Sequence, residues 1–335
     1  MIMNSTKIMF LSLLILSTLV TLSSTNWMGM WMGLEMNLMT FIPLISKSKN
    51  KNSSQAMMMY FLTQSIGSIT MLFSVVMNPL IFVSPNLIEE LNKMLIIAGG
   101  LIKLGAAPFH FWLPELVANL TWVECMILLT WQKVAPMFLV YSVVPTNNWM
   151  FYSSIALCTI TGAVGGLNQT SLRKIVAYSS ISHMGWMMML IAMSGSWYKY
   201  LMIYSILVVM LCMTLKSMNA LFINQLNSCS PSLAQKMTIT SLMMSMGGLP
   251  PFLGFLPKWM VIQMMINSEL YGLMLLMMLT SLITLFYYLR MMVPFILNYS
   301  SMNKWMIKKT FESPLMMLTL FTNSMLPLVL IYSFF

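Results

Sequence analysis

The sequence predicts an all-α polytopic membrane protein with about eleven transmembrane helices, forming one membrane domain over residues 1–335. Hydrophobic residues make up 59% of the chain and charged residues only 7%, whereas soluble domains contain roughly 25% charged residues. The apolar residues fall into segments of about 20, the length that crosses a bilayer as a helix. The polar connections between these segments are too short to fold as separate domains.

The expected spans follow one another along the whole chain. A helix satisfies its own backbone hydrogen bonds inside hydrocarbon, so each apolar segment is expected to be helical. The first is interpreted as a span rather than a signal peptide, because no small-residue cleavage site and ten more apolar segments follow it. The segments are approximately 8–25, 27–45, 56–77, 91–112, 122–144, 149–168, 174–194, 199–222, 237–266, 270–293 and 314–334. The fourth continues as a second half-helix over 108–120, and the ninth is interrupted.

The charges of the connecting loops predict the orientation in the membrane. The loops on the same side of the membrane as the N-terminus hold ten basic residues, whereas the loops on the other side hold only Lys93 and Lys199. Loops rich in Lys and Arg stay inside, so the N-terminus is expected inside and, with an odd number of spans, the C-terminus outside. A net charge of +10 therefore indicates orientation here and not a nucleic-acid partner. The ten residues are Lys7, Lys47, Lys49, Lys51, Arg173, Lys174, Lys236, Lys304, Lys308 and Lys309.

Two apolar segments contain helix-breaking residues next to a lysine. Residues 99–115 read GGLIKLGAAPFHFWLPE and contain Lys103, and residues 247–259 read GGLPPFLGFLPKW and contain Lys258. Broken helices at membrane depth are tolerated only where the freed backbone is buried in protein or lines a wet cavity. Paired interruptions of this kind indicate an ion site. Lys103 precedes its proline, whereas Lys258 follows three prolines, so the two sites are expected to differ in role.

Few other ionisable residues lie inside the predicted spans. A charged side chain at mid-bilayer costs at least about 2.5–3.5 kcal/mol unless it is paired, hydrated or neutral. Burial lowers the pKa of a lysine and a nearby carboxylate raises it, so making or breaking a Glu–Lys contact can load or release a proton. The candidates for proton translocation are Glu35, Lys103, Lys133 and Lys258, with His183 and His110 as further candidates.

Structural interpretations of the same residues stay open. Glu35 and a lysine could form a static ion pair that holds helices together, and either histidine could be a satisfied packing residue. Glu124 is interpreted as structural. Lys216 and Arg290 lie near span ends, from which long basic side chains reach the lipid headgroups.

No cofactor is expected on this chain. The four cysteines show no CxxC spacing, which argues against a disulfide framework and a metal site. The chain also lacks the cysteine clusters of iron–sulfur proteins, a nucleotide-binding glycine motif and paired histidines for haem. The 43 methionines indicate an AT-rich gene translated with a code that reads AUA as Met, which points to a mitochondrial genome.

Three motifs carry a family resemblance: residues 99–115, residues 168–186 (NQTSLRKIVAYSSISHMGW) and residues 247–259. The chain resembles the antiporter-like membrane subunits of respiratory complex I, of the mitochondrially encoded animal type, over essentially its whole length. The resemblance implies two inverted five-helix repeats, each with a discontinuous helix, and a proton path along the membrane midplane. Family members usually have fourteen helices, whereas about eleven are predicted for this chain. The animal type is shortened at the N-terminus, which agrees with the lower number.

The resemblance also implies a role for each residue in a proton-pumping core subunit. Glu35 would modulate Lys103 on the first broken helix, Lys133 on the next helix would relay, and Lys258 on the second broken helix would exchange protons. NADH, FMN, iron–sulfur clusters and ubiquinone are expected on other subunits. Expected partners are other membrane-arm subunits, including adjacent antiporter-like ones, and lipids such as cardiolipin. The expected location is the mitochondrial inner membrane, with the N-terminus in the matrix and the C-terminus in the intermembrane space. The alternatives are a stand-alone cation/proton antiporter and a static membrane scaffold.

Overall fold

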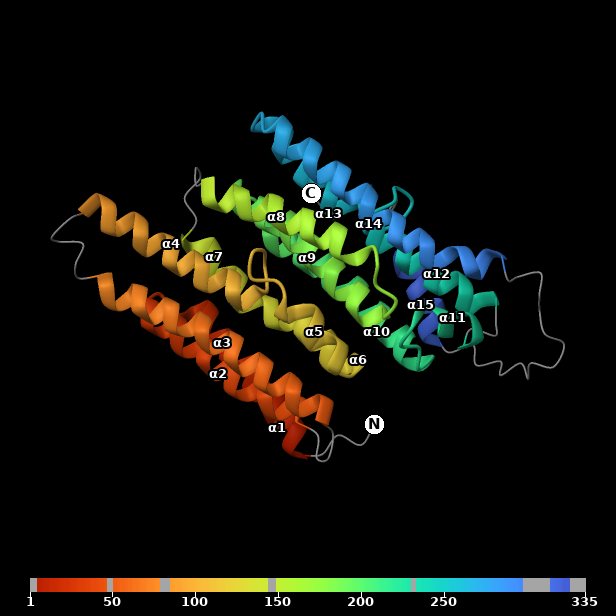
Figure 1. Ribbon diagram of the computed structural model, residues 1–335, viewed down its shortest axis with the longest axis horizontal. Coiled ribbons are helices and arrows are strands. Elements are labelled where there is room, and N and C mark those ends of the chain that lie inside the picture. Colours follow the sequence, from red (N-terminus) through yellow and green to blue (C-terminus); the bar gives the residue numbers. More distant parts are fainter. Residues whose placement is uncertain are drawn as a thin grey trace. The chain divides into compact units, whose positions relative to one another are not determined.

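The computed structural model describes residues 5–46, 51–78, 85–143, 149–229, 233–297 and 314–325. These residues are almost entirely helical, as Figure 1 shows, apart from an isolated bridge between Ser171 and Phe222. The chain divides into two compact units, Met1–Ser154 and Ile155–Phe335. That the two units together form one membrane domain, as the sequence predicts, stays a prediction. Lys47, Lys49, Lys304, Lys308, Lys309 and the last nine residues of the eleventh predicted span lie outside the described residues.

The first unit is built from helices that precede and follow a break near residue 105. Its helices are α1 (Ser5–Ser23), α2 (Trp27–Ile45), α3 (Lys51–Met77), α4 (Pro85–Leu104), α5 (Trp112–Asn119), α6 (Trp122–Thr130) and α7 (Val134–Val143), and α8 (Trp149–Gly166) crosses the boundary between the units. A short 3₁₀ turn, Trp131–Lys133, joins α6 to α7. Helix α1 packs against α2, α3 packs against α2, α4 and α5, and α7 packs against α4.

Glu124 has the structural role that the sequence indicated. The backbone N–H of Thr121 donates to Oε2 of Glu124 at 2.9 Å, and the two residues form a capping box at the start of α6. A capping box satisfies N–H groups that would otherwise lack partners at a helix N-terminus. Glu124 therefore fixes where this helix begins.

The second unit surrounds one deeply buried helix. Its helices are α9 (Leu172–Ala192), α10 (Trp197–Ser217), α11 (Ile223–Cys229), α12 (Leu233–Gly247), α13 (Phe255–Asn267), α14 (Tyr271–Leu297) and α15 (Pro314–Asn323). Helix α9 is buried over almost its whole length, and α10, α13 and α14 pack against it. Polar side chains on α9 are therefore held away from solvent by neighbouring helices.

Seven described helices are long and apolar enough to cross a membrane: Ser5–Ser23, Trp27–Ile45, Lys51–Met77, Trp122–Val143, Leu172–Ala192, Trp197–Ser217 and Tyr271–Val293. They coincide with the first, second, third, fifth, seventh, eighth and tenth predicted spans. The all-helical polytopic fold is thus confirmed, whereas the count of eleven and the inverted relation of the repeats stay predictions.

The first predicted discontinuity is present between α4 and α5. The N–H of Ala106 donates to the carbonyl of Leu101 at 3.0 Å, and the N–H of Gly105 donates to that of Ile102 at 3.2 Å. This double pattern is a Schellman motif, which ends a helix with a residue in the left-handed region. Gly105 has φ +67°. The helix therefore ends at a glycine three residues before Pro108.

The second discontinuity, between α12 and α13, ends in the same way. The N–H of Leu249 donates to the carbonyl of Met244 at 3.3 Å, and the N–H of Gly248 donates to that of Ser245 at 3.0 Å. Gly248 has φ +79°. The two broken helices therefore share one local termination motif, although their prolines lie at different positions in the sequence.

Candidate functional site

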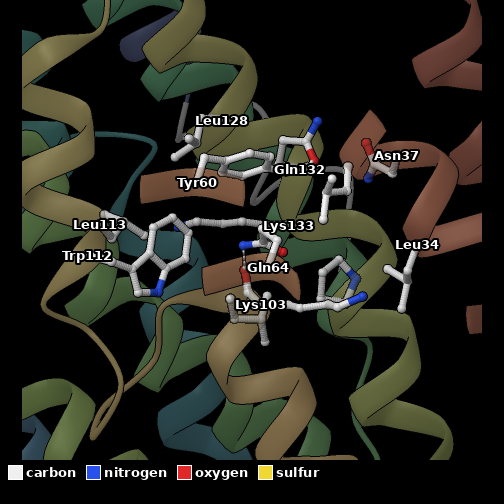
Figure 2. A pocket seen from close by; sticks show the side chains of 13 residues that line it. Leu34, Asn37, Tyr60, Gln64, Lys103, Trp112, Leu113, Leu128, Gln132 and Lys133 are labelled. Carbon is white, nitrogen blue, oxygen red and sulfur yellow. Dashed lines mark hydrogen bonds between the residues drawn. The ribbon is translucent and has the colours of Figure 1, made fainter. Parts of the chain in front are cut away.

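A small polar cavity lies beside the break between α4 and α5 in the first unit (Figure 2). Its polar lining residues are Asn37, Tyr60, Gln64, Lys103, Gln132 and Lys133. The space open to the centre of a water molecule is about 20 Å³, which is enough for one water. Helices α2, α3 and α4 and the turn between α6 and α7 each contribute polar atoms to it.

Two of the sequence-predicted residues, Lys103 and Lys133, are brought together in this cavity. Their exposed fractions are only 6% and 3%. Lys103 stands on the last turn of α4, directly before the break. Lys133 ends the 3₁₀ turn between α6 and α7, and Pro136 follows inside α7. A proline cannot donate to the carbonyl four residues earlier, which accounts for the irregular backbone at Lys133.

The Lys103 ammonium has no hydrogen-bond partner among the described residues. In Figure 2 the side chain extends toward Leu34 on α2. Glu35 is the next residue on α2, is half-buried, and is the carboxylate that attracts Lys103 electrostatically. The two make no direct ion pair within the described part of the chain. Glu35 and Lys103 are thus electrostatic neighbours and not a closed salt bridge.

The backbone around Lys103 is held by side chains from two other helices. Nε2 of Gln64 on α3 donates to the Lys103 carbonyl at 3.1 Å. Nε1 of Trp112 on α5 donates to the Ile102 carbonyl at 3.2 Å. The last carbonyls of a helix lack intrahelical partners, and here the break is stabilised by these two donors. Gln64 and Trp112 therefore position Lys103.

Two further polar atoms of the cavity lack partners in the described residues: Oδ1 of Asn37 and Nε2 of Gln132. The Tyr60 hydroxyl donates to the other amide atom of Gln132, Oε1, at 3.3 Å. A buried polar atom without a partner costs about 1–3 kcal/mol, and a buried water typically makes about three hydrogen bonds. The cavity is therefore both polar enough and large enough to hold a water.

The sequence analysis did not identify Asn37, Gln64, Gln132 or Trp112. Polar residues inside an apolar span are a functional signal, and Asn37 and Gln132 lie two and one residues from the predicted Glu35 and Lys133. That proximity could have identified them. Gln64 and Trp112 bind backbone atoms, and nothing in the sequence indicates that.

Lys258 has a different environment in the second unit. It is buried on the first turn of α13, and its Nζ donates to the carbonyl of Gly247, the last residue of α12, at 2.7 Å. A cation at the C-terminus of a helix also interacts favourably with the helix dipole. Nζ lies 5.9 Å from the ring centroid of Trp186, within cation–π range. Lys258 is therefore hydrogen-bonded across its break, in contrast to Lys103.

The two candidate histidines have different surroundings. His183 is buried on α9, one turn from Trp186, and its Nδ1 is hydrogen-bonded to the Tyr200 hydroxyl at 2.8 Å. His110 lies in the loop between α4 and α5, half-buried, with its ring 4.2 Å from that of Phe111. His110 is not one of the residues lining the cavity. The structure thus associates His183 with the Lys258 region and leaves His110 apart from the lysines of its own unit.

Within the described residues, no group of three or more His, Cys, Asp and Glu side chains could hold a metal ion. The expectation that this chain binds no cofactor stays a prediction.

Two of the solved structures with similar folds are respiratory membrane complexes. A chain of respiratory complex I from Thermus thermophilus with bound aureothin superposes with a TM-score of 0.79 at 20% identity, covering 87% of this chain and 70% of that one. A chain of the archaeal membrane-bound sulfane sulfur reductase gives a TM-score of 0.80 at 15% identity, covering 97% and 72%. At these identities the likeness shows the fold alone.

Sequence relatives are much closer. The model of the family described as "NADH:quinone oxidoreductase/Mrp antiporter, TM" matches residues 24–284. The NADH-ubiquinone oxidoreductase chain 2 of Locusta migratoria is 42% identical over 306 residues, covering 90% of this chain and 89% of the relative. That of Anopheles gambiae is 42% identical over 325 residues, covering 94% and 93%. The resemblance carried by the three motifs is thereby confirmed, and the chain belongs to the family of animal NADH-ubiquinone oxidoreductase chain 2.

Proposed function

We propose that this chain is a core membrane-arm subunit of the proton-pumping NADH:ubiquinone oxidoreductase in the mitochondrial inner membrane. It contributes a proton path through Glu35, Lys103, Lys133 and Lys258, while NADH, FMN, iron–sulfur clusters and ubiquinone are bound by other subunits. The observation that carries the proposal is the cavity beside the first broken helix, because two buried lysines line it together. Quinone reduction elsewhere in the complex supplies the energy.

The geometry supports Lys103 as the group that gains and loses a proton. Its ammonium has no hydrogen-bond partner to break among the described residues, and Glu35 attracts its charged form. Opposite charges about 4 Å apart attract by about 4 kcal/mol at an effective dielectric near 20. Moving one charge against the membrane potential costs about 2.3 kcal/mol per 100 mV. A change in the Glu35–Lys103 separation is therefore large enough in energy to drive release.

Lys133 is the proposed acceptor across the cavity. Both lysines line this cavity, which has room for one water, and a proton passes from the ammonium of Lys103 to water and from water to the neutral amine of Lys133. Protons then pass to Lys258, with His183 as a relay on α9. His110 stays a candidate relay at the first break.

The proposed orientation places the N-terminus in the matrix and the C-terminus in the intermembrane space. The ten-to-two distribution of basic residues between the two sets of loops supports it. Proposed partners are adjacent antiporter-like subunits, other membrane-arm subunits, and anionic lipids such as cardiolipin, without nucleic acid.

A double substitution, Glu35→Gln with Lys103→Met, tests the proton path against a static scaffold. We expect proton pumping per NADH oxidised to fall in complex I reconstituted into liposomes, because proton transfer through a positioned group contributes about 100-fold or more. NADH oxidation by an artificial acceptor is expected to be unchanged, since it involves other subunits. The scaffold alternative predicts full pumping, because the double variant keeps the packing and removes both charges together.

A native gel tests the stand-alone antiporter alternative. We expect this chain to migrate with NADH dehydrogenase activity, because membership of the chain 2 family favours an assembled subunit. Migration as a small complex without that activity would favour the antiporter.

A further inference from the structure

The second unit contains a buried group of hydroxyl side chains that the proposed path does not use. Tyr200 and Tyr204 on α10 and Tyr287 and Tyr288 on α14 are each at most 2% exposed. All four surround α9, the central helix of the unit. We refer to these four residues as the tyrosine cluster.

The tyrosine cluster contacts a polar face of α9. The His183 ring lies 5.1 Å from the Tyr204 ring and is hydrogen-bonded to Tyr200. The rings of Tyr287 and Tyr288 lie 4.8 Å apart. Their hydroxyls face Ser182 and Ser179 of α9, respectively, and Tyr204 interacts electrostatically with Tyr288. The tyrosine cluster and the His183 imidazole are therefore buried next to one another around α9.

One end of the group lies near Lys258. His183 precedes Trp186 by one helical turn on α9, and the Lys258 ammonium lies over the Trp186 ring. The indole N–H only donates, so Trp186 itself does not relay a proton between His183 and Lys258.

The other end lies at the loop between α8 and α9. The ring of Tyr287 packs against Gly166, the last residue of α8: a Cβ there would lie 2.7 Å from Cε1 of Tyr287. Arg290 was expected to reach the headgroups, but its guanidinium instead donates to the carbonyls of Leu167 and Gln169 in that loop. Arg173 and Lys174 follow on the first turn of α9, and we refer to this loop together with that turn as the basic loop. The tyrosine cluster thus occupies the half of the second unit between Lys258 and the basic loop.

Packing alone does not explain hydroxyls at these positions. The Tyr287 and Tyr288 hydroxyls have no hydrogen-bond partner of normal geometry among the described residues. Phenylalanine would fill the same space without burying these polar atoms. A hydroxyl and a neutral imidazole each donate and accept, so a file of them passes a proton when each group accepts on one side and donates on the other.

We propose that the tyrosine cluster and His183 form a proton branch that connects Lys258 with the basic loop side of the second unit. A proton enters from the side of the basic loop at Tyr287 and Tyr288, passes through Tyr204, Tyr200 and His183, and reaches the neutral amine of Lys258 by way of water. At each hydroxyl and at the imidazole one bond to hydrogen forms and another breaks, so each is neutral again afterwards, the Lys258 amine becomes an ammonium, and no group is oxidised or reduced. The branch rests on the proposed function, because it supplies Lys258.

The test uses Tyr288→Phe and Tyr204→Phe in whole complex I reconstituted into liposomes. We expect proton transfer through the branch to slow by about 100-fold, so pumping per NADH oxidised falls. The amount of complex on a native gel is expected to match or exceed that of the unmodified chain for Tyr288→Phe, which keeps the ring and removes a buried hydroxyl that has no hydrogen-bond partner among the described residues. For Tyr204→Phe, which also keeps the ring, the amount is expected to stay close to that of the unmodified chain. The matched controls are Tyr198→Phe on α10 and Tyr271→Phe on α14, because these residues are 55% and 57% exposed; both are expected to pump normally.

Lys258→Met serves as the reference for interpreting these variants. Lost pumping in Lys258→Met together with full pumping in both tyrosine variants would overturn the branch and leave the proposed function intact. Full pumping in Lys258→Met would overturn the proposed function and the branch with it. Reduced pumping in the tyrosine variants, with a normal amount of complex and normal controls, supports the branch. Heavy water is expected to slow proton pumping more in the unmodified chain than in the variants. A purely structural role of the tyrosines would not produce this difference.

Discussion

A Lys258→Met substitution is expected to lower both proton pumping and the amount of assembled complex I. Methionine fills nearly the same space but leaves the Gly247 carbonyl without the donor that Lys258 provides at 2.7 Å. Gly247 is buried, and a buried carbonyl without a partner costs about 1–3 kcal/mol. The same substitution removes the group proposed to exchange protons. Both effects are measured on one sample, by a native gel and by pumping in liposomes.

Lys103→Met is the matched comparison, and it is expected to lower pumping alone. The Lys103 ammonium has no partner in the described residues, so its removal leaves no donor or acceptor newly unsatisfied. Burying a charge that has no hydrogen-bond partner costs free energy, and an apolar side chain at the same place does not have this cost. The amount of assembled complex should therefore stay the same or rise. Equal losses of assembly in the Lys103 and Lys258 variants would contradict the different bonding assigned to the two lysines.

The two broken helices could be predicted from the sequence because glycine and proline are conspicuous in apolar spans. The residues that end the helices could not be predicted so well. The sequence analysis treated glycine and proline alike as helix-breaking residues, whereas in the structure Gly105 and Gly248 end the helices because each adopts a positive φ. The two motifs also differ in what satisfies their last carbonyls: Gln64 and Trp112 at one break, and Lys258 at the other. Those donors come from other turns and helices, so tertiary packing decides them.

The sequence predicts which residues carry the chemistry of the candidate site, but it does not predict how they are arranged in space. A lysine inside an apolar span is a functional signal wherever it occurs, which identified Lys103 and Lys133 separately. That both line one cavity follows from the packing of α4 against α7, which the sequence does not specify. The tyrosine cluster was missed because tyrosines are ordinary in apolar helices. Only the burial of all four around α9 distinguishes them.

Gly254→Ala is expected to be the most destabilising single substitution at the second break. Gly254 is buried at the start of α13, and a Cβ there would overlap the carbonyl oxygen of Ser245 and lie 2.7 Å from its carbonyl carbon. Ser245 belongs to the Schellman motif that ends α12. The backbone of one helix end would have to move against the other, so a cost of about 3 kcal/mol or more is expected. A lower inactivation temperature of NADH:ubiquinone activity and less assembled complex would show it.

Gly272→Ala is the control for this prediction, and the expected effect has the opposite sign. Gly272 is the second residue of α14, and no atom lies within 4 Å of the position its Cβ would take. Alanine favours a helix over glycine by about 1 kcal/mol, so this variant should be as stable as the unmodified chain or more stable. A general intolerance of methyl groups in the chain would destabilise both variants alike. Opposite effects would show that the destabilisation arises where the end of α12 contacts the start of α13. The Gly247 carbonyl that Lys258 binds lies at that helix end.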